Sequence, residues 1–208
     1  MKPERGRFIV LEGGEGAGKS TQAQVIADWL RARGREVMQT REPGGTSTAE
    51  AIRALILADR TPALPPLAEL LLMFAARLSH VEEKIRPALA RGADVVCDRF
   101  VDASYAYQGA GRGLPLAAIR ALERMTLRGL KPDLVLLFDI EPEAGLARAR
   151  SRGDANRFEA EALAFQKRVR AAYRTRARGA PKRYVRIDAG RSQGEVSAAV
   201  LRVLEKKL

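Results

Sequence analysis

A glycine-rich segment near the N-terminus carries residue types that bind phosphate. It reads Gly13-Gly14-Glu15-Gly16-Ala17-Gly18-Lys19-Ser20 and fits the pattern G-x-x-x-x-G-K-[ST]. Glycines allow the backbone N–H groups of such a loop to point at a polyphosphate, and a following helix presents its positive end to the same anion. Lys19 is expected to bridge the terminal phosphates, while Ser20 supplies a hydroxyl to Mg²⁺. The segment predicts a site for a nucleoside triphosphate and its Mg²⁺ ion.

A carboxylate that supports this Mg²⁺ should end a neighbouring apolar strand. Asp98 follows a short apolar run and precedes Arg99, whereas Asp139 follows the run from Leu134 to Phe138. Asp139 is explained more simply as a strand-end or helix-cap residue. We therefore predict that Asp98 is the carboxylate that serves the metal.

Three further segments could hold a phosphate acceptor, which a kinase needs and an ATPase does not. They are Arg41-Glu42-Pro43-Gly44-Gly45-Thr46 with Arg53, Met73-Phe74-Ala75-Ala76-Arg77, and Asp98-Arg99-Phe100 with Ser104, Tyr107 and Gln108. Guanidinium groups match phosphate oxygens bidentately, so these arginines predict a second anion site. A regulatory GTPase is excluded, because the guanine-reading motif Asn-Lys-x-Asp cannot be built around the only asparagine, Asn156.

Short apolar runs and helical patterns alternate along the chain, and these elements must position the candidate residues. The runs, typical of strands buried on both faces, are Phe8 to Leu11, Glu36 to Thr40, Asp94 to Cys97, Leu134 to Ile140 and Tyr184 to Ile187. Helical patterns cover Lys19 to Arg33, Thr48 to Ala58, Leu67 to Arg91, Pro115 to Leu127, Glu143 to Arg150, Glu159 to Arg178 and Gln193 to Lys207. Gln108 to Gly113 is predicted as a glycine-rich loop.

This alternation predicts an α/β sandwich of three layers, with a five-stranded parallel sheet flanked by helices. Ligands are expected outside the carboxyl ends of its strands. The 208 residues suit a single domain over positions 1–208.

Composition narrows the classes of function further. A single cysteine, Cys97, and a single histidine, His80, exclude an internal disulfide, a His/Cys metal site and a Cys-His nucleophile. No apolar run is long enough for a membrane span and the N-terminus lacks a signal peptide, so we expect a cytoplasmic protein. The net charge of +12 indicates anionic partners, but aromatic residues make up only 5%, few for stacking on single-stranded nucleic acid. A nucleic acid partner is therefore not expected.

Taken in order, these motifs strongly resemble those of thymidylate kinase, the bacterial form in particular. The resemblance runs from about Arg7 to Glu159 and rests on Glu12 to Thr21, Thr40 to Thr46, Asp98-Arg99-Phe100, Tyr107-Gln108-Gly109 and Gly111-Arg112-Gly113. It implies the P-loop NTPase fold, a homodimer, and Mg²⁺-dependent transfer of phosphate from ATP to dTMP, which gives dTDP for dTTP biosynthesis. It also implies that ATP is bound by Gly13, Gly14, Glu15, Gly16, Ala17, Gly18, Lys19, Ser20 and Thr21.

The same resemblance implies the residues of the acceptor pocket. Arg99 and Arg53 hold the acceptor phosphate and Arg77 the pyrimidine edge. Ser104 and Gln108 bond the base, Tyr107 crowds the sugar 2′ position, and Glu42 and Pro43 belong to the same pocket. Either Met73 or Phe74 faces the base. Glu15 contacts the acceptor nucleotide, where it could orient the sugar hydroxyl or position the arginine that holds the phosphate.

An arginine-rich segment, about residues 148–158, resembles the mobile lid that closes over ATP in bacterial thymidylate kinases. Arg148 is expected to bind the cofactor, and Arg150 and Arg152 to act in catalysis with Lys19, Arg99 and Glu15. On a helix Arg148 and Arg152 share a face that Arg150 does not, so not all of these arginines can reach the transferred phosphate. No general base is required, because the acceptor phosphate is already an anionic nucleophile.

Three other functions remain open on the sequence: a kinase for another nucleoside monophosphate, an ATPase that acts on nucleic acid, and a nucleotide-binding module without turnover.

Overall fold

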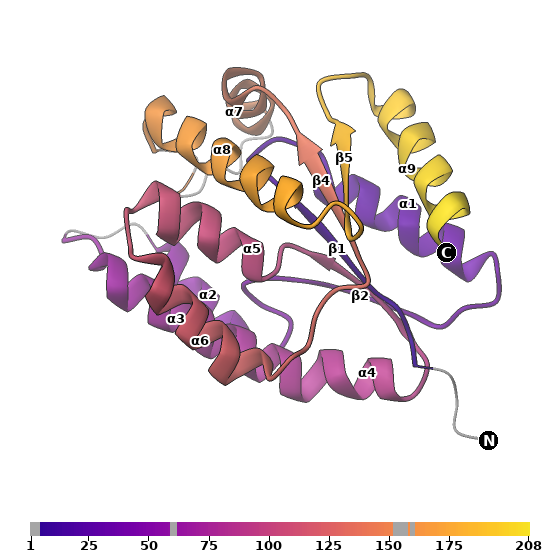
Figure 1. The fold of residues 1–208 in the computed structure, drawn as a ribbon, viewed down its shortest axis with the longest axis horizontal. Helices are drawn as coiled ribbons and strands as arrows, with labels where there is room; N and C mark the ends of the chain where they lie inside the picture. The colour runs from indigo at the N-terminus through magenta and orange to yellow at the C-terminus, as the bar shows by residue number, and fades with distance from the viewer. Residues whose placement is uncertain (1–4, 59–61, 152–157, 159–160) are drawn as a thin grey trace.

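A computed structural model of the chain describes residues 5–58, 62–151, 158 and 161–208. Its centre is a five-stranded sheet in which every pair of neighbouring strands is parallel, in the order β2-β3-β1-β4-β5 (Figure 1). The strands are β1 (Phe8–Gly13), β2 (Val37–Arg41), β3 (Asp94–Asp98), β4 (Leu134–Asp139) and β5 (Tyr184–Asp188). All five predicted strands are confirmed, with ends that differ by at most two residues.

The burial of each strand follows its place in the sheet. The three inner strands β1, β3 and β4 are buried almost throughout, while the edge strands β2 and β5 are partly exposed. Helices on both faces leave the inner strands no polar side, which is why they read as continuous apolar runs.

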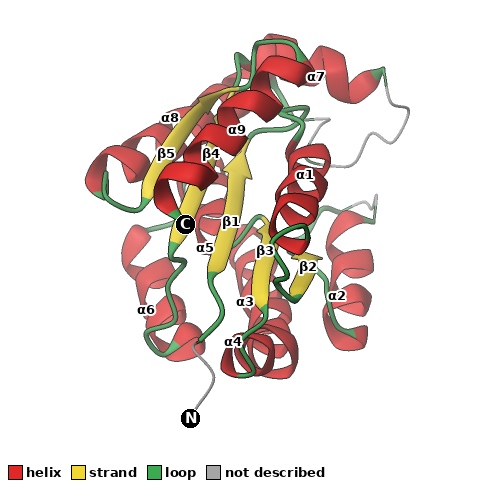
Figure 2. Ribbon diagram, turned by 90° about the vertical axis from the view of Figure 1, so that its right-hand side faces the viewer, coloured by secondary structure: helices red, strands yellow, loops and turns green. Residues whose placement is uncertain are grey.

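Two helices cover one face of the sheet and the remaining described helices lie mainly on the other. On the first face α1 (Lys19–Arg31) and α9 (Gln193–Lys207) pack through Ile26 and Val196 against Ile9 and Leu136 (Figure 2). On the other face α3 (Pro66–His80) and α6 (Leu116–Leu127) pack through Phe74 and other apolar residues against Phe8. The remaining helices are α2 (Ser47–Leu57), α4 (Arg86–Ala90), α5 (Val101–Ser104), α7 (Pro142–Arg150) and α8 (Leu163–Gly179). The three-layer sandwich is confirmed.

The predicted helix from Leu67 to Arg91 is one helical run that contains a π-helical stretch. The run passes from α3 through the π-helical segment η1 (Val81–Ile85) into α4, and it begins and ends within one residue of the prediction. The predicted helix from Glu159 begins later, because α8 starts at Leu163.

The prediction of a glycine-rich loop at Gln108 to Gly113 is wrong for most of that segment. Helix α5 continues into a second π-helical segment, η2 (Tyr105–Gly111). A Cβ atom at Gly111 would lie 2.5 Å from the ring of Phe165 on α8. The glycine is therefore explained by close helix packing rather than by a turn, a use that sequence alone does not distinguish.

Strand register gathers the candidate residues at one edge of the sheet. Leu11 on β1 and Arg41 on β2 both pair with Asp98 on β3, and Gly13 pairs with Phe138 on β4. The segments that follow these strands therefore start side by side, as expected for a ligand site in an open parallel sheet. None of the helices within the described ranges is both long and apolar enough for a membrane crossing.

Candidate active site

The phosphate-binding loop connects β1 to α1 and is pressed against α7. Gly16 has a φ of +67°, and a Cβ atom there would lie 1.9 Å from the carbonyl oxygen of Gly145. Only glycine combines this left-handed backbone with so close an approach. The motif thus has the strand, loop and helix context that it requires.

Lys19 is the first residue of α1 and is almost completely buried beneath the loop. Its side chain is 7% exposed, and Nζ donates to the carbonyl oxygen of Gly14 at 2.8 Å. Burial lowers the pKa of its ammonium group, and the positive charge of Arg99 lowers it further. An anion beside Nζ would favour the charged form, so the site is electrostatically suited to a phosphate.

One cavity of about 500 Å³ joins the phosphate-binding loop to the predicted acceptor pocket. From the loop side it is lined by Glu15, Gly16, Ala17, Gly18, Lys19, Ser20 and Thr21. From the acceptor side it is lined by Glu42, Pro43, Arg53, Met73, Arg77, Asp98, Arg99, Ser104, Tyr107 and Gln108. Gly13 and Gly14 line a smaller adjacent cavity instead, against Phe138 and Asp139.

Arg99 stands between the two halves of this cavity. Its Nη2 donates to Oε1 of Glu15 at 2.7 Å, and its Nη1 donates to the carbonyl of Gly13 at 2.9 Å. The hydroxyl of Tyr107 donates to the same Glu15 oxygen at 2.8 Å. Burial lowers the pKa of the Arg99 guanidinium, but the acidic groups around it, Glu15 foremost, together outweigh burial, so this pKa lies well above its usual value. Of the two roles considered for Glu15, the contacts favour positioning the arginine.

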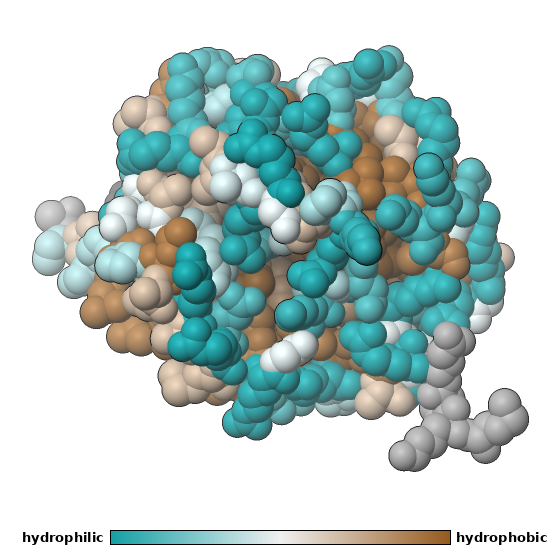
Figure 3. Space-filling model, viewed as in Figure 1, coloured by the Kyte–Doolittle hydropathy of each residue, from teal (hydrophilic) through white to brown (hydrophobic). Residues whose placement is uncertain are grey.

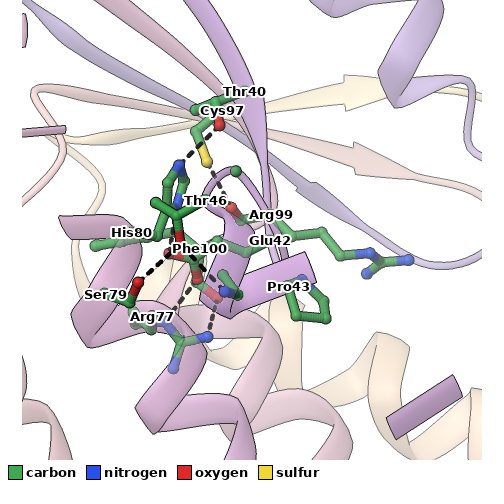
Figure 4. A network of polar contacts seen from close by, with 12 residues as sticks. Thr40, Glu42, Pro43, Thr46, Arg77, Ser79, His80, Cys97, Arg99 and Phe100 are labelled. Carbon is green, nitrogen blue, oxygen red and sulfur yellow. Dashed lines mark hydrogen bonds and ion pairs between the residues drawn. The ribbon is translucent and has the colours of Figure 1, made fainter. Parts of the chain in front are cut away.

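Arg77 is fixed by a buried network that reaches across to β2 (Figure 4). The guanidinium is 3% exposed and donates to Oε2 of Glu42 at 2.7 Å, to the hydroxyl of Ser104 at 3.0 Å and to the carbonyl of Phe100 at 3.2 Å. The other Glu42 oxygen lies 3.2 Å from Nδ1 of His80. A carboxylate only accepts, so Nδ1 carries a proton, and Nε2 forms a hydrogen bond with the hydroxyl of Thr40 at 2.7 Å.

The contacts of this network change the meaning of two residues. Glu42 lines the cavity, but both its carboxylate oxygens contact protein side chains. Its role is therefore to hold the Arg77 guanidinium in position. His80 has no exposed surface and contacts Glu42, so the structure gives it a structural role.

Of the two candidates for facing the base, Met73 lines the cavity and Phe74 does not. Phe74 is 1% exposed in the core beneath the sheet, with the Arg77 guanidinium 4.6 Å from the centre of its ring. We predicted Phe74 as a pocket residue, and the structure corrects this: Phe74 belongs to the core. Adjacent positions on a helix point about 100° apart, so only one of the two can face the cavity. Arg53 also reaches the cavity, where its Nη1 donates to the carbonyl of Pro43 at 2.9 Å.

Known proteins match the chain over nearly its whole length. The family model described as thymidylate kinase matches residues 11–200. The chain is 55% identical over 206 residues to a thymidylate kinase of Chromohalobacter salexigens, an alignment that covers 98% of this chain and 97% of that protein. It is 58% identical over 185 residues to one of Pseudomonas fluorescens, with 89% and 88% covered. A crystal structure of thymidylate kinase from Ehrlichia chaffeensis superposes with a TM-score of 0.80 at 30% identity, covering 96% of this chain and 99% of that one.

The chain belongs to the thymidylate kinase family. The resemblance inferred from the motifs is thereby confirmed, and so is the P-loop NTPase fold that it implied. The chain is thus a member of a family of nucleoside monophosphate kinases. An ATPase that acts on nucleic acid is therefore no longer the main explanation of its positive charge.

The predicted metal ligands lie together. The hydroxyl of Ser20 donates to Oδ2 of Asp98 at 2.8 Å, while Oδ1 of Asp98 is buried without a hydrogen bond among the described residues. Asp139 is already occupied, because Arg170 and Arg174 both donate to it at 2.7 Å. Within the described ranges no three His, Cys, Asp or Glu side chains cluster as metal ligands. Mg²⁺ commonly takes one or two carboxylates plus phosphates, so Ser20 and Asp98 fit such an ion.

The predicted lid arginines have different outcomes. Arg148 on α7 donates to the carbonyls of Ala189 at 2.7 Å and Gly190 at 3.0 Å, so it fixes the loop after β5 and does not line the cavity. Arg150 is exposed near the end of α7 and does not line the cavity either. Arg152 and most of the segment 148–158 lie outside the described residues.

Glu12, the last charged position before the loop, was not singled out by sequence reasoning. It is completely buried on β1, and its Oε1 accepts from the backbone N–H of Phe100 at 2.9 Å. This bond holds the residue next to Arg99, whose φ of +71° is unusual for a residue other than glycine. Burial, and then the charge of Asp102, raises the pKa of Glu12 to about 8. A lone acid inside an apolar strand was the available signal.

We expect the free energy of unfolding of Glu12→Gln, relative to that of the wild type, to increase as pH rises. The pKa of Glu12 is about 8 in the folded state against 4.5 for an ordinary glutamate. Between these values the folded protein holds a proton that the unfolded chain releases, so this group's contribution to the free energy of unfolding falls as pH increases. Urea denaturation of both proteins at about pH 5 and about pH 8 measures this. A difference between variant and wild type that is the same at both pH values would contradict the shifted pKa.

Proposed function

We propose that this protein transfers the γ-phosphoryl group of ATP to dTMP, giving ADP and dTDP for dTTP synthesis. The observation that carries the proposal is the shared cavity, in which the phosphate-binding loop faces an arginine-lined pocket with Arg99 between them. A kinase needs its two anions held end to end in this way, because transfer proceeds in line between them.

On the donor side the loop N–H groups and Lys19 would bind the β- and γ-phosphates. Ser20 and Asp98 would hold Mg²⁺, which neutralises charge on the same phosphates when it is bound. Lys19 is preorganised for this role by its bond to Gly14 inside the loop. Arg150 and Arg152 of the lid, about residues 148–158 of a kinase domain over 1–208, remain our candidates for charge at the transferred group.

On the acceptor side Arg99 and Arg53 would hold the dTMP phosphate for attack. One of its oxygens forms a bond to the γ-phosphorus as the bond from that phosphorus to the β-phosphate oxygen breaks, and ADP leaves. No proton must be removed from the nucleophile. Glu15 and Tyr107 keep the Arg99 guanidinium in place, and Met73 and Arg77 form the wall for the base.

We also propose a cytoplasmic homodimer. The exposed large apolar side chains support a second copy on the face formed by α2, α3 and α6, because they are concentrated there. They include Leu55, Leu67, Leu71, Leu116 and Met125, each at least 41% exposed. Figure 3 shows apolar surface at the left, where these helices lie in Figure 1, whereas polar residues cover much of the rest of this view. Exposed apolar clusters of this kind commonly mark protein interfaces.

An ADP-release assay with Mg-ATP tests the proposed reaction. dTMP, dUMP, dCMP, dGMP, AMP and UMP are compared with a sample that has no acceptor. We expect turnover with dTMP to exceed that with every other monophosphate. A preference for another monophosphate, or hydrolysis that does not depend on an acceptor, would overturn the proposal for dTMP and leave the phosphate-binding loop unaffected.

A further inference from the structure

A buried carboxylate lies behind the base wall of the cavity. Glu69 on α3 has no exposed surface, and its Oε1 accepts from Nε2 of Gln108 at 2.7 Å. Its Oε2 lies 3.4 Å from Nη2 of Arg112, which also forms an ion pair with Glu161 at 2.5 Å. Glu69 does not line the cavity, whereas Gln108 does.

The chemistry of this pair determines which end of the Gln108 amide is left for a ligand. An ionised carboxylate accepts hydrogen bonds and donates none. The amide nitrogen of Gln108 must therefore face Glu69, and the amide oxygen is the end that remains for the cavity. The opposite orientation would set the amide oxygen against a carboxylate, with no hydrogen between them.

We propose that Glu69 controls the choice of acceptor base, because it holds Gln108 with its oxygen toward the base. An amide oxygen accepts from a ring N–H, which thymine and uracil carry at N3. Cytosine has a lone pair at the same ring position, so its N3 faces an oxygen with no hydrogen to share. Glu69 is thus a positioning residue for selection of pyrimidines with an N3–H. This inference rests on the proposed function.

Glu69→Gln tests the proposal, because a glutamine at position 69 can donate as well as accept. Gln108 then has a partner in either orientation and can present its NH₂ group to the base. We expect kcat/KM for dCMP to rise about ten-fold and kcat/KM for dTMP to fall only a few-fold. The ratio of the dTMP value to the dCMP value should therefore fall more than ten-fold. A merely structural role would lower both values alike, and an unchanged ratio overturns the proposal.

Two further variants keep this test decisive. Glu123→Gln is the matched control, because Glu123 accepts from the hydroxyl of Tyr105 at 2.5 Å and does not line the cavity. Its dTMP to dCMP ratio should equal that of the wild type. Gln108→Leu removes the amide itself and covers the case in which Glu69→Gln does not fold. Its ratio should also fall about ten-fold, and an unchanged ratio would show that the amide does not read the base.

The wild-type protein separates this inference from the proposed function. If the wild type does not prefer dTMP to dCMP, the proposed function fails before any variant is measured. If the wild type prefers dTMP and Glu69→Gln keeps the full preference, only the role of Glu69 fails.

Discussion

Lys19→Ala is expected to lower kcat for phosphoryl transfer by about 10³ or more while the fold remains intact. Preorganised cations at a transferring phosphoryl group contribute on this scale, because they neutralise charge without reorganising. The side-chain hydrogen bond described for Lys19 goes to Gly14 within its own loop, so its removal leaves the core contacts unchanged. Single-turnover kinetics with saturating Mg-ATP and dTMP measure the loss, and circular dichroism measures the fold.

Lys167→Ala is the matched control for this variant. Lys167 lies on α8, 57% exposed, where it pairs with Glu143 at 2.9 Å and does not line the cavity. An exposed ion pair contributes little to stability, so turnover should stay near the wild-type value. Lys19→Ala turnover within about ten-fold of wild type would remove the phosphate-binding loop from the mechanism.

The strands and the motif residues were predictable because each has a local signal. A strand buried on both faces must be apolar throughout, and the loop needs glycine where its backbone meets Gly145. The joining of the two anion sites followed from topology, since parallel strands place Arg41, Asp98 and the loop at one edge. Both kinds of inference use constraints that the sequence states directly.

The errors and omissions involve partners that lie far apart in the sequence. Gly109 and Gly111 indicated a loop, but Gly111 is a glycine because Phe165 lies against it. Glu69 is one acid in an apolar helix, and its use appears only when Gln108, 39 residues later, lies beside it. Arg148 stays a predicted ATP ligand, and its Nη1 and Nη2 donate to backbone carbonyls of the loop after β5, contacts that the sequence did not indicate. A side chain's type limits what it can bind, but the fold decides which partner it meets.

The fold likewise decides which partners the many arginines meet. The net charge of +12 is spread over a chain in which many arginines meet buried or half-buried acids, as Arg35 meets Asp94 and Arg176 meets Asp102. Arg35 and Arg176 do not line the cavity, so we interpret these pairs as structural. Counting arginines therefore overstates the guanidinium groups available to an anionic partner, which is why geometry identifies Arg99 and Arg53 where composition could not.

Arg99→Ala is expected to damage acceptor use most, with a rise in KM for dTMP of about 10² to 10³ and a smaller rise in KM for ATP. The loss has two sources. The dTMP phosphate loses its guanidinium partner, and the Glu15 carboxylate, 15% exposed, loses the charge that balances it. Truncating one member of a buried charged pair costs about 2 to 5 kcal/mol, which corresponds to this range.

Arg99→Lys and Arg178→Ala show whether this loss reflects the guanidinium itself. Arg99→Lys keeps the charge but cannot bond Glu15 and Gly13 as a planar fork, so it should recover only part of the acceptor affinity. Arg178→Ala, at an exposed position near the end of α8, should leave both KM values unchanged. Initial rates over a matrix of ATP and dTMP concentrations separate the two substrates. A larger loss for ATP than for dTMP would place Arg99 at the donor, and no loss for either would remove it from both sites.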